Sequence, residues 1–252
     1  MKLTVYRKKD WVFLIGSMEK NQMHKHYAIQ ISIPIEGTLT LIANTEETTF
    51  KTAVFIKPNI LHRLESKGNN LHIFFNPHSR IGFYINSLIR DKPYYFNDEL
   101  ITNLVRPAKD FINNVIDIAS LAECIEKNFE ESSSFKKFES NASERILSVL
   151  DYIYKNKHRW VQAEECANLI HLSKSRFLHF FNEETGSTFR RSQLWIRICE
   201  SVMMLKEKGI SETAHHYGFY DNAHYGRAFK ENLGFTPKAF INSAVLYNIS
   251  EN

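Results

Sequence analysis

The chain has 252 residues, of which 43% are hydrophobic and 24% are charged, and its formal net charge is +4. This composition excludes disordered and fibrous proteins, and the length is sufficient for two domains that each bury a core. No apolar stretch is long enough to span a membrane, and the run from Trp11 to Ile15 is too short for a convincing secretory signal. We therefore expect a cytoplasmic protein with two domains.

The cysteine spacing and the net charge bear on disulfide bonds, zinc sites and binding to nucleic acid. Cys124, Cys166 and Cys199 lie far apart without a CxxC pair, which argues against a disulfide framework and a zinc ribbon, so we expect buried thiols. The mildly basic charge is compatible with binding to nucleic acid. Residues 141–252 contain 14 Lys and Arg against 12 Asp and Glu, a net charge of +2, so any DNA binding depends on where individual charges lie.

Strands are predicted in the front of the chain, over residues 24–75. The segments IQISIPIEGTLTLIA and TTFKTAVFIKP combine alternating polarity with β-branched residues, and turn-forming residues separate them. Several short strands at this close spacing predict a small antiparallel barrel or sandwich.

The pattern changes to helix from about Asn97. Apolar residues then recur every three or four positions, as in the seam of a short coiled coil: Phe111, Val115, Ile118, Ala122, Ile125 and Phe129. Such a helix either forms a dimer or packs on its own barrel, and the sequence does not decide between the two. The polar run Glu131–Asn141 follows this helix and is the expected linker between domains.

The rear of the chain is predicted to be entirely helical, because no strand pattern remains after the linker. The expected helices cover residues 142–156, 161–170, 174–184, 189–208, 210–217, 222–232 and 237–243. The predicted division is a front domain over residues 1–96, a helical dimerisation or linker region over 97–140, and a rear domain over 141–252.

Two parts of the rear domain, around Glu165–Phe189 and Gly218–Pro237, repeat one pattern. Each has a small residue in a leading helix, a capping residue, two aromatic residues four positions apart and a terminal glycine. In chain order these residues are Ala167, Ser173, Phe177, Phe181 and Gly186, and then Ala214, Asp221, Tyr225, Phe229 and Gly234. The pattern predicts two helix-turn-helix units, joined by the long helix Phe189–Lys208.

The spacing A-x(5)-S-x(3)-F-x(3)-F-x(4)-G, followed by GF-x-D-x(5)-R-x-FK-x(3)-G-x-TP, resembles the AraC/XylS family of transcription regulators over residues 142–243. Arg197 and Ser201 match positions of the family's joining helix, whereas Phe240–Ile241 replaces a frequent Tyr-Arg pair. The resemblance implies a two-domain α+β fold, with an N-terminal antiparallel cupin-like barrel, a helical linker and an all-α C-terminal domain with two helix-turn-helix units. It also implies a sequence-specific DNA-binding regulator and no enzyme, with promoter DNA, RNA polymerase, a small-molecule effector and a second copy of the chain as partners.

Base-reading residues are expected on the outward faces of the second helix of each unit, where a recognition helix presents donors to base edges. Arg227 can give two donors to a guanine and Asn222 can pair with an adenine, although Arg227 could instead pair internally with Asp221 or Glu231. The expected base-reading set is Ser175, Leu178, His179, Asn222, Ala223, Gly226 and Arg227. Contacts to the DNA backbone are expected from Ser173, Lys174, Arg176, Arg190, Arg191 and Lys230.

The front half is similar, less specifically, to the cupin-type sensor domain that many such regulators carry, through HKHYAIQISIPIEGTLTLI and FIKPNILHRLE. His24, His26 and Gln30 share strand parity, and His62 follows a proline-containing turn, as in the order of a cupin metal site with Gln30 at the carboxylate position. We expect these four residues to line an effector pocket. A divalent transition metal is the alternative occupant, but glutamine is a weak neutral ligand, so no cofactor is expected.

Two questions remain open from the sequence. Ala28, Gln30 and Ser32 share the histidine face of their strand, and isoleucines crowd the other face. If the histidine face points inward, helices or a second subunit must cover the isoleucines; if it points outward, the pocket hypothesis fails. The alternative function is a metal-dependent cupin enzyme that uses these histidines and carries an accessory helical DNA-binding domain.

Overall fold

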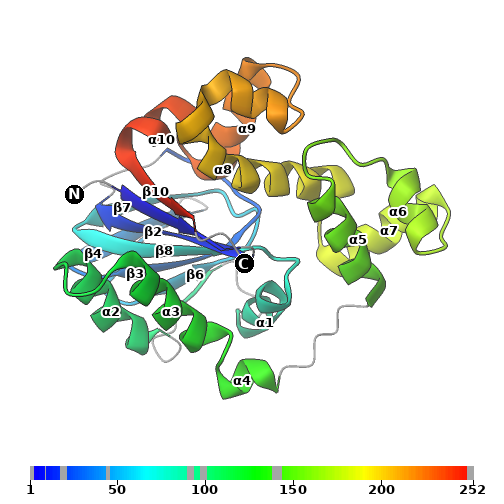
Figure 1. Cartoon of the computed structure of the whole chain (residues 1–252). Coiled ribbons are helices and arrows are strands. Elements are labelled where there is room, and N and C mark those ends of the chain that lie inside the picture. Colours follow the sequence, from blue (N-terminus) through cyan, green and yellow to red (C-terminus); the bar gives the residue numbers. More distant parts are fainter. Residues whose placement is uncertain are drawn as a thin grey trace.

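The fold has a β-sheet front half and a helical rear half (Figure 1). The computed structural model describes residues 3–8, 10–17, 22–43, 46–89, 94–96, 101–137 and 144–248. The predicted domain boundaries near residues 97 and 140 lie outside these described residues. The two-domain fold, with antiparallel sheets in front and helices behind, agrees with the fold class expected from the sequence.

The strands form two sheets. A seven-stranded sheet has the order β10-β1-β2-β8-β3-β6-β9, and a three-stranded sheet has the order β5-β4-β7. The strands are β1 (Leu3–Arg7), β2 (Trp11–Ser17), β3 (Ile29–Pro34), β4 (Thr38–Ala43), β5 (Glu46–Phe50), β6 (Val54–Ile56), β7 (His62–Lys67), β8 (Asn69–Phe75), β9 (Tyr94–Phe96) and β10 (Ala244–Asn248). All described pairs are antiparallel except β1 with β10.

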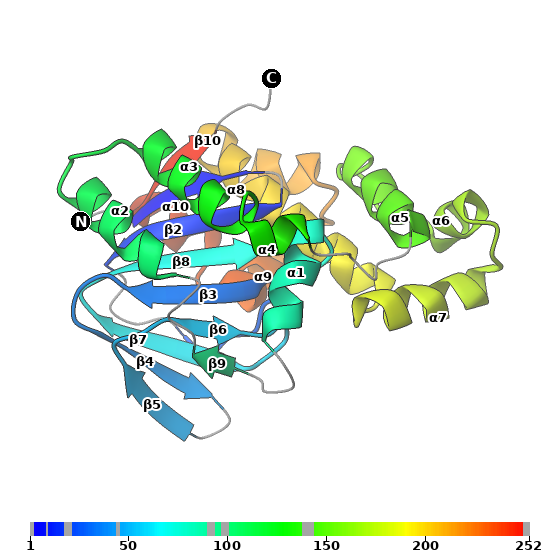
Figure 2. The ribbon, with the colours of Figure 1, turned by 90° about the horizontal axis from the view of Figure 1, so that it is seen from below.

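Both faces of β3 are buried, which answers the question of its orientation. Ile29, Ile31 and Ile33 pack in one core with the helices that follow the sheets in the chain. These helices are α1 (Arg80–Leu88), α2 (Thr102–Ile112), α3 (Ile118–Phe129) and the short α4 (Ser133–Lys136), and Figure 2 shows them along one face of the large sheet. Gln30 and Ser32 therefore point to the opposite, interior face, as the inward alternative required.

The predicted coiled-coil seam is wrong as one continuous helix. The chain leaves the helix between α2 and α3, where Asn114 has a positive φ of 57° and Val115 is 69% exposed. Ala122, Ile125 and Phe129 are buried in the core of the large sheet. Because the apolar side of α3 is already covered by its own sheet, this helix packs in the second of the two ways that the sequence left open, on its own domain and not in a dimer seam.

The rear helices follow the predicted order with small shifts at their ends. They are α5 (Glu144–Lys155), α6 (Ala163–Leu169), α7 (Lys174–Thr185), α8 (Phe189–His216), α9 (Asn222–Leu233) and α10 (Pro237–Ser243). The predicted helices 189–208 and 210–217 run together as α8 and meet at a kink, where Gly209 has φ 74° and ψ 177°. Glycine tolerates this conformation, so the chain changes direction there without a loop.

Two further sequence expectations need correction. A strand does occur after the linker, because β10 pairs in parallel with β1. The segment AVLYN is short, and its pairing depends on a free edge of β1 far away in the sequence, which no local pattern reveals. Cys166 is a buried thiol as expected, whereas Cys124 and Cys199 are only half-buried, and all three are free.

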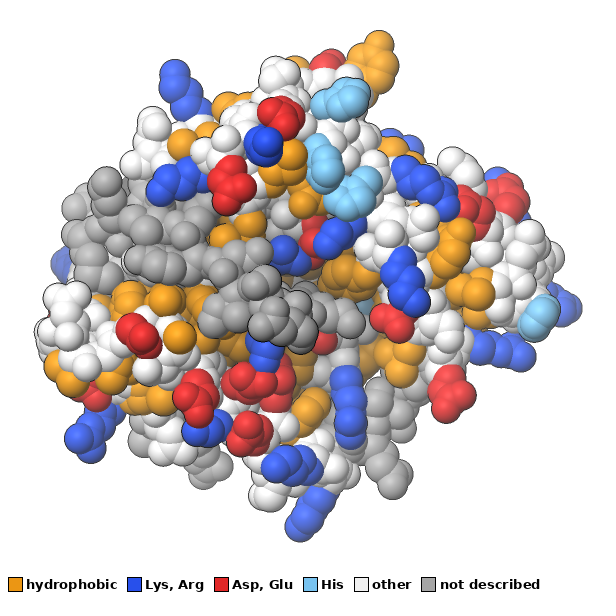
Figure 3. Space-filling model, viewed as in Figure 1, with side chains coloured by type: hydrophobic (Ala, Val, Ile, Leu, Met, Phe, Trp, Pro, Cys, Tyr) orange, Lys and Arg blue, Asp and Glu red, His pale blue; other side chains and the backbone are white. Residues whose placement is uncertain are grey.

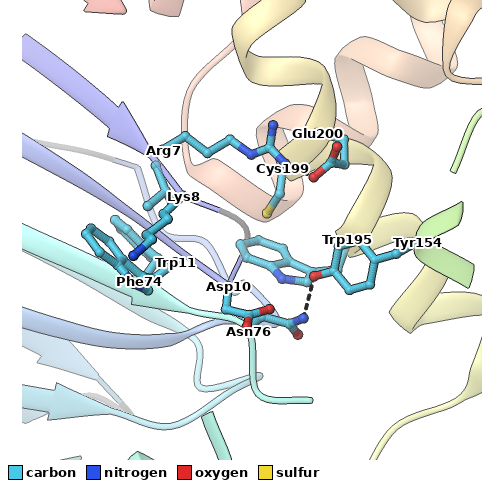
Figure 4. Close-up of a pocket in the computed structure, with 11 residues that line it drawn as sticks. Arg7, Lys8, Asp10, Trp11, Phe74, Asn76, Tyr154, Trp195, Cys199 and Glu200 are labelled. Atoms are coloured by element: carbon cyan, nitrogen blue, oxygen red, sulfur yellow. Dashed lines mark hydrogen bonds and ion pairs between the residues drawn. The ribbon is translucent and has the colours of Figure 1, made fainter. Parts of the chain in front are cut away.

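A buried carboxylate joins the two halves of the chain. Glu200 on α8 is only 3% exposed and forms ion pairs with Arg7 on β1 and with Lys157, which follows α5. Figure 4 shows Arg7 and Glu200 at the wall of a small cavity between β1, β2 and α8, where Trp11 and Trp195 also lie. Since all three charges are paired at least partly out of water, the cluster is sensitive to loss of any member.

We predict that Glu200→Ala lowers the free energy of unfolding by about 3 kcal/mol, because it leaves two cations at a buried junction without their carboxylate. Chemical denaturation monitored by circular dichroism measures this change. Glu212→Ala removes the exposed partner of Lys208 and is the control, with an expected loss below about 0.5 kcal/mol. Equal losses for the two variants would show that the Glu200 cluster does not hold the halves together.

Candidate functional site

The first helix-turn-helix unit has the expected caps and core. The Ser173 hydroxyl accepts from the Arg176 backbone N–H at the start of α7, and Gly186 ends the helix in the left-handed conformation. Phe177 and Phe181 are fully buried in a core shared by α5, α6 and α7. Local sequence therefore sets both ends of α7, and its aromatic pair orients the helix on its unit.

The second unit repeats this construction. The Asp221 carboxylate accepts from the His224 N–H at 2.6 Å at the start of α9, and Gly234 ends the helix with φ 81°. Tyr225 and Phe229 are fully buried, and the Tyr225 hydroxyl lies 2.9 Å from the hydroxyl of Ser201 on α8. Ser201 thus fixes α9 against the joining helix, which gives a structural reason for a small polar residue at that position.

Arg197, which matches a position of the family motif, is a structural residue. Its side chain is 1% exposed, its Nε donates to the Lys157 carbonyl, and its guanidinium lies 3.9 Å from the centre of the Trp160 ring. Burial lowers the pKa of Arg197 to about 10. The cation therefore packs the loop after α5 onto α8 instead of facing solvent.

The predicted base-reading residues lie on the surface of α7 and α9. All of them are exposed except the half-buried Gly226: Ser175, Leu178, His179, Asn222, Ala223 and Arg227. Within the described part of the chain, no carboxylate forms an ion pair with Arg227, and Asp221 is engaged in capping α9. His179 lies 3.2 Å from Glu183 on its own helix. The internal pairing considered for Arg227 is thus not observed.

The residues predicted to contact the DNA backbone differ in their exposure and in their partners within the protein. Lys174 pairs with Glu164 at 2.7 Å, and Arg190 lies 5.4 Å from the centre of the Trp160 ring. Arg191 is half-buried, whereas Lys230 is exposed on α9. On the face seen in Figure 3, Lys and Arg side chains alternate with Asp and Glu, so this face carries no block of a single sign.

Four buried residues of the front half come together as the sequence predicted, and we call them the histidine cluster: His24, His26, Gln30 and His62. The Gln30 Oε1 atom lies 2.6 Å from Nε2 of His26 and 3.2 Å from Nε2 of His62. Backbone hydrogen bonds between residues 24 and 62 tie the two segments together. His24 and His26 lie in the segment before β3, Gln30 lies in β3, and His62 is the first residue of β7. The cluster thus joins parts of the chain that are far apart in sequence.

Burial keeps these imidazoles neutral. Desolvation is the main cause that lowers the pKa of His62 to about 3, and the neighbouring His24 adds to the effect. Desolvation also lowers the pKa of His26 well below its ordinary value, with His62 and His24 as further causes. Neutral imidazole is the form that can offer a lone pair to a ligand or a metal.

A cavity adjoins the histidine cluster and is lined by both the sheet and the rear helices. His24, Gln30 and His72 form the polar part of its wall. The remaining wall is largely apolar and comes from both halves of the chain: Val5, Val12, Leu14, Phe74, Cys199, Val202, Leu233, Phe235 and Phe240. Sequence analysis missed these residues because they belong to β1, β2, β8, α8, α9, α10 and the turn between α9 and α10, which only the tertiary fold brings together.

Comparison with known proteins gives the helical half an identity. Residues 166–243 match the family described as "Helix-turn-helix domain". They form an AraC-type helix-turn-helix domain. The chain is a DNA-binding transcription regulator of this type, and its relatives are regulators, which does not support the enzyme alternative.

Two curated relatives and one solved structure show how far the AraC-type likeness extends. The uncharacterized regulator YidL of Escherichia coli is 25% identical over 214 residues, covering 80% of this chain and 70% of YidL. The uncharacterized regulator in the cgkA 5' region of Pseudoalteromonas carrageenovora is 24% identical over 149 residues, covering 57% of this chain and 89% of that protein. ToxT from Vibrio cholerae has a TM-score of 0.62 at 16% identity, over 94% of this chain and 98% of ToxT. This last likeness shows a shared two-domain fold.

Two ToxT structures contain small organic acids. One holds an unsaturated fatty acid, and another holds (E)-4-(8-methylnaphthalen-1-yl)but-3-enoic acid.

In the regulator described here, the helices that the structure describes include none that is both long and apolar enough to cross a membrane.

One surface residue of the AraC-type domain was missed by sequence analysis. Tyr220 is 92% exposed and directly precedes the cap residue of α9. An aromatic ring so exposed next to a predicted base-reading helix is a further candidate for contact with DNA. The signal was present in the sequence as the variable position of GF-x-D, but only the structure shows that Phe219 is buried and Tyr220 is not.

The end of α9 lies directly on the histidine cluster, and this contact can be tested. A Cβ atom added at Gly234 would lie 3.0 Å from Cγ and Nδ1 of His24, whereas one added at Gly186 would meet nothing within 4 Å. Both glycines have a positive φ, so alanine is strained at either position. We predict that Gly186→Ala costs about 1 kcal/mol and Gly234→Ala about 2 kcal/mol of unfolding free energy. Thermal or chemical denaturation measures both, and equal costs would contradict the contact with His24.

Proposed function

We propose that α7 and α9 enter successive major grooves on one side of promoter DNA and read two half-boxes about one helical turn, roughly 10 bp, apart. The observation that supports this most directly is the repeated unit, in which each second helix has a capped start, a buried aromatic pair and an exposed outer face. An exposed, rigidly held helix face is what groove reading requires.

Within this proposal the two helices contribute unequally. Arg227 has no ion-pair partner among the described residues, and with Asn222 it supplies fixed hydrogen-bond donors on α9. On α7, Leu178 is 39% exposed and His179 lies beside Glu183, so that face has fewer free donors. We therefore assign base hydrogen bonding mainly to α9, and methyl contacts and DNA shape mainly to α7.

We propose further that a small molecule in the cavity next to the histidine cluster controls the regulator. The wall is mostly apolar with one polar part, which suits an apolar ligand with a single polar group, a description that also fits the acids held by ToxT. Since α8, α9 and α10 supply four of the twelve wall residues and the front half supplies seven, a ligand there contacts both the sheet and the second unit. We also propose that the regulator forms a homodimer and contacts RNA polymerase. The proposed domains are residues 1–96, 97–140 and 141–252.

Selection of genomic fragments by the purified full-length protein at one stated salt concentration tests the DNA proposal. Two enriched half-boxes about one turn apart are expected if both units read DNA. A single half-box would contradict the role of one unit, and no enrichment with either the full chain or residues 141–252 would contradict the whole proposal. Adding a medium-chain fatty acid to the same selection tests the effector, since an unchanged pattern and affinity would argue against acids of this kind.

Arg227→Ala should relax the preference for one base and weaken specific binding by about 1 to 3 kcal/mol, because it removes two donors to a base edge. Lys230→Ala is the matched control on the same helix, since Lys230 is exposed and expected to contact phosphate. It should weaken binding to specific and random DNA alike, and it should reduce the slope of log affinity against log salt concentration by about one. Fluorescence anisotropy with a selected site, point-mutated sites and random DNA distinguishes the two. Equal losses on all DNA for Arg227→Ala would refute its role in base reading.

A further inference from the structure

The hydrogen bonds around the histidine cluster place the ring proton of each histidine on Nδ1 and leave none on Nε2. Nδ1 of His24 lies 2.9 Å from the Gln22 carbonyl, Nδ1 of His26 lies 3.0 Å from the Ala28 carbonyl, and Nδ1 of His62 lies 2.9 Å from the Ile60 carbonyl. A carbonyl oxygen only accepts, so each Nδ1 must carry the ring proton. A neutral imidazole has one such proton, and each Nε2 is therefore left with a bare lone pair.

The Gln30 amide adds a fourth lone pair to the same place. Its nitrogen donates to the Ser32 hydroxyl at 2.7 Å, which turns Oε1 toward the histidines. The Ser32 hydroxyl in turn lies 2.9 Å from Nδ1 of His72, so it can accept from Gln30 and donate to His72. Oε1 then faces Nε2 of His26 at 2.6 Å and Nε2 of His62 at 3.2 Å, and no hydrogen lies on any of these three atoms.

Acceptors that face one another in a buried site repel unless a cation lies among them. His26, Gln30 and His62 are each at most 2% exposed and His24 is 6% exposed, so water provides little relief. The ring nitrogens of the three histidines lie within 4.8 Å of one another. Ligand atoms that share a transition metal ion lie about 3 to 3.5 Å apart, a spacing close to that around Gln30 Oε1.

We propose that His24, His26, His62 and the amide oxygen of Gln30 bind one divalent first-row transition metal ion, such as Zn²⁺ or Co²⁺. Three imidazoles with one oxygen suit these ions better than Mg²⁺ or Ca²⁺, which prefer oxygen ligands. The backbone carbonyls act as the outer partners that orient each ring. The sequence disfavoured a metal because glutamine replaces a carboxylate, but it could not show how the Nδ1 atoms are engaged.

The position of the site gives the ion a structural role. His24 and Gln30 also line the cavity, so a bound ion forms part of the cavity wall. Gly234 at the end of α9 packs against the His24 ring. An ion that fixes this ring therefore also fixes the surface on which the second unit packs. The inference stands on the front half alone and does not depend on which bases or which effector the regulator recognises.

The test is a titration of the full-length protein, prepared without a polyhistidine tag, with Co²⁺ followed by visible absorption. Zn²⁺ content after dialysis is measured separately. We expect about one equivalent of either metal and a higher melting temperature in its presence. His62→Ala should weaken Co²⁺ binding at least about 100-fold. His78→Ala is the control, because His78 is equally buried but bonds to Ser192 away from the cluster, and it should bind as the parent does.

Gln30→Glu keeps the test decisive if His62→Ala does not fold. An added carboxylate should tighten metal binding about tenfold or more, because it contributes charge at the fourth ligand position. If the Gln30 amide were rotated instead, its N–H groups would satisfy His26 and His62 and no ion would be needed. Less than a tenth of an equivalent of bound metal, or Co²⁺ binding that neither variant changes, would overturn the proposal and leave only adventitious binding at exposed histidines.

Discussion

The large β-sheet is buried on both faces, and this double burial determines how the rest of the chain is arranged. One face carries an apolar core with α1, α2 and α3. The other faces the small sheet at one end and the rear helices at the other, where Leu3, Val5 and Leu14 share a core with α8, α9 and α10. Without the rear helices, the apolar residues of β1 and β2 on this face would be exposed to water, at a cost of about 25 cal/mol for each Å².

The two helix-turn-helix units are consequently attached to the front half in different ways. The core of the first unit contains residues of α5, α6, α7 and α8 and none of the sheet, and Figure 1 shows this unit projecting to one side. The second unit shares its core with the sheet and ends on His24. The second unit therefore forms part of the cavity wall, whereas the first unit meets the front half through single contacts. The Tyr27 hydroxyl donates to the Thr185 carbonyl at the end of α7, and the Asn76 amide donates to the Tyr154 hydroxyl of α5.

Buried polar groups from both halves of the chain lie around the junction between the sheet and the rear helices. Glu200 neutralises Arg7 and Lys157 on one side, and the histidine cluster lies beside the cavity on the other. Buried polar groups need partners of the right kind, and here the partners come from elements distant in sequence. The junction is thus the place where the two halves hold together, and it lies next to the cavity and the histidine cluster.

The sequence by itself determined the local features of the second half. Ser173, Asp221, Gly186 and Gly234 act through backbone groups within a few residues, so their caps and the helix ends were predictable from spacing alone. The convergence of His24, His26, Gln30 and His62 was also predicted, from strand parity and a turn, together with the resemblance to a cupin.

Only the tertiary structure decided the features that depend on distant partners. β10 pairs with β1 because β1 offers an edge far away in the sequence, and α3 packs on its own sheet instead of on a second helix. The cavity wall and the Nδ1 hydrogen bonds follow from how loops and helices pack, which no periodicity encodes. Local patterns report which face of an element is apolar, but the element that covers that face is selected by the packing of the whole chain.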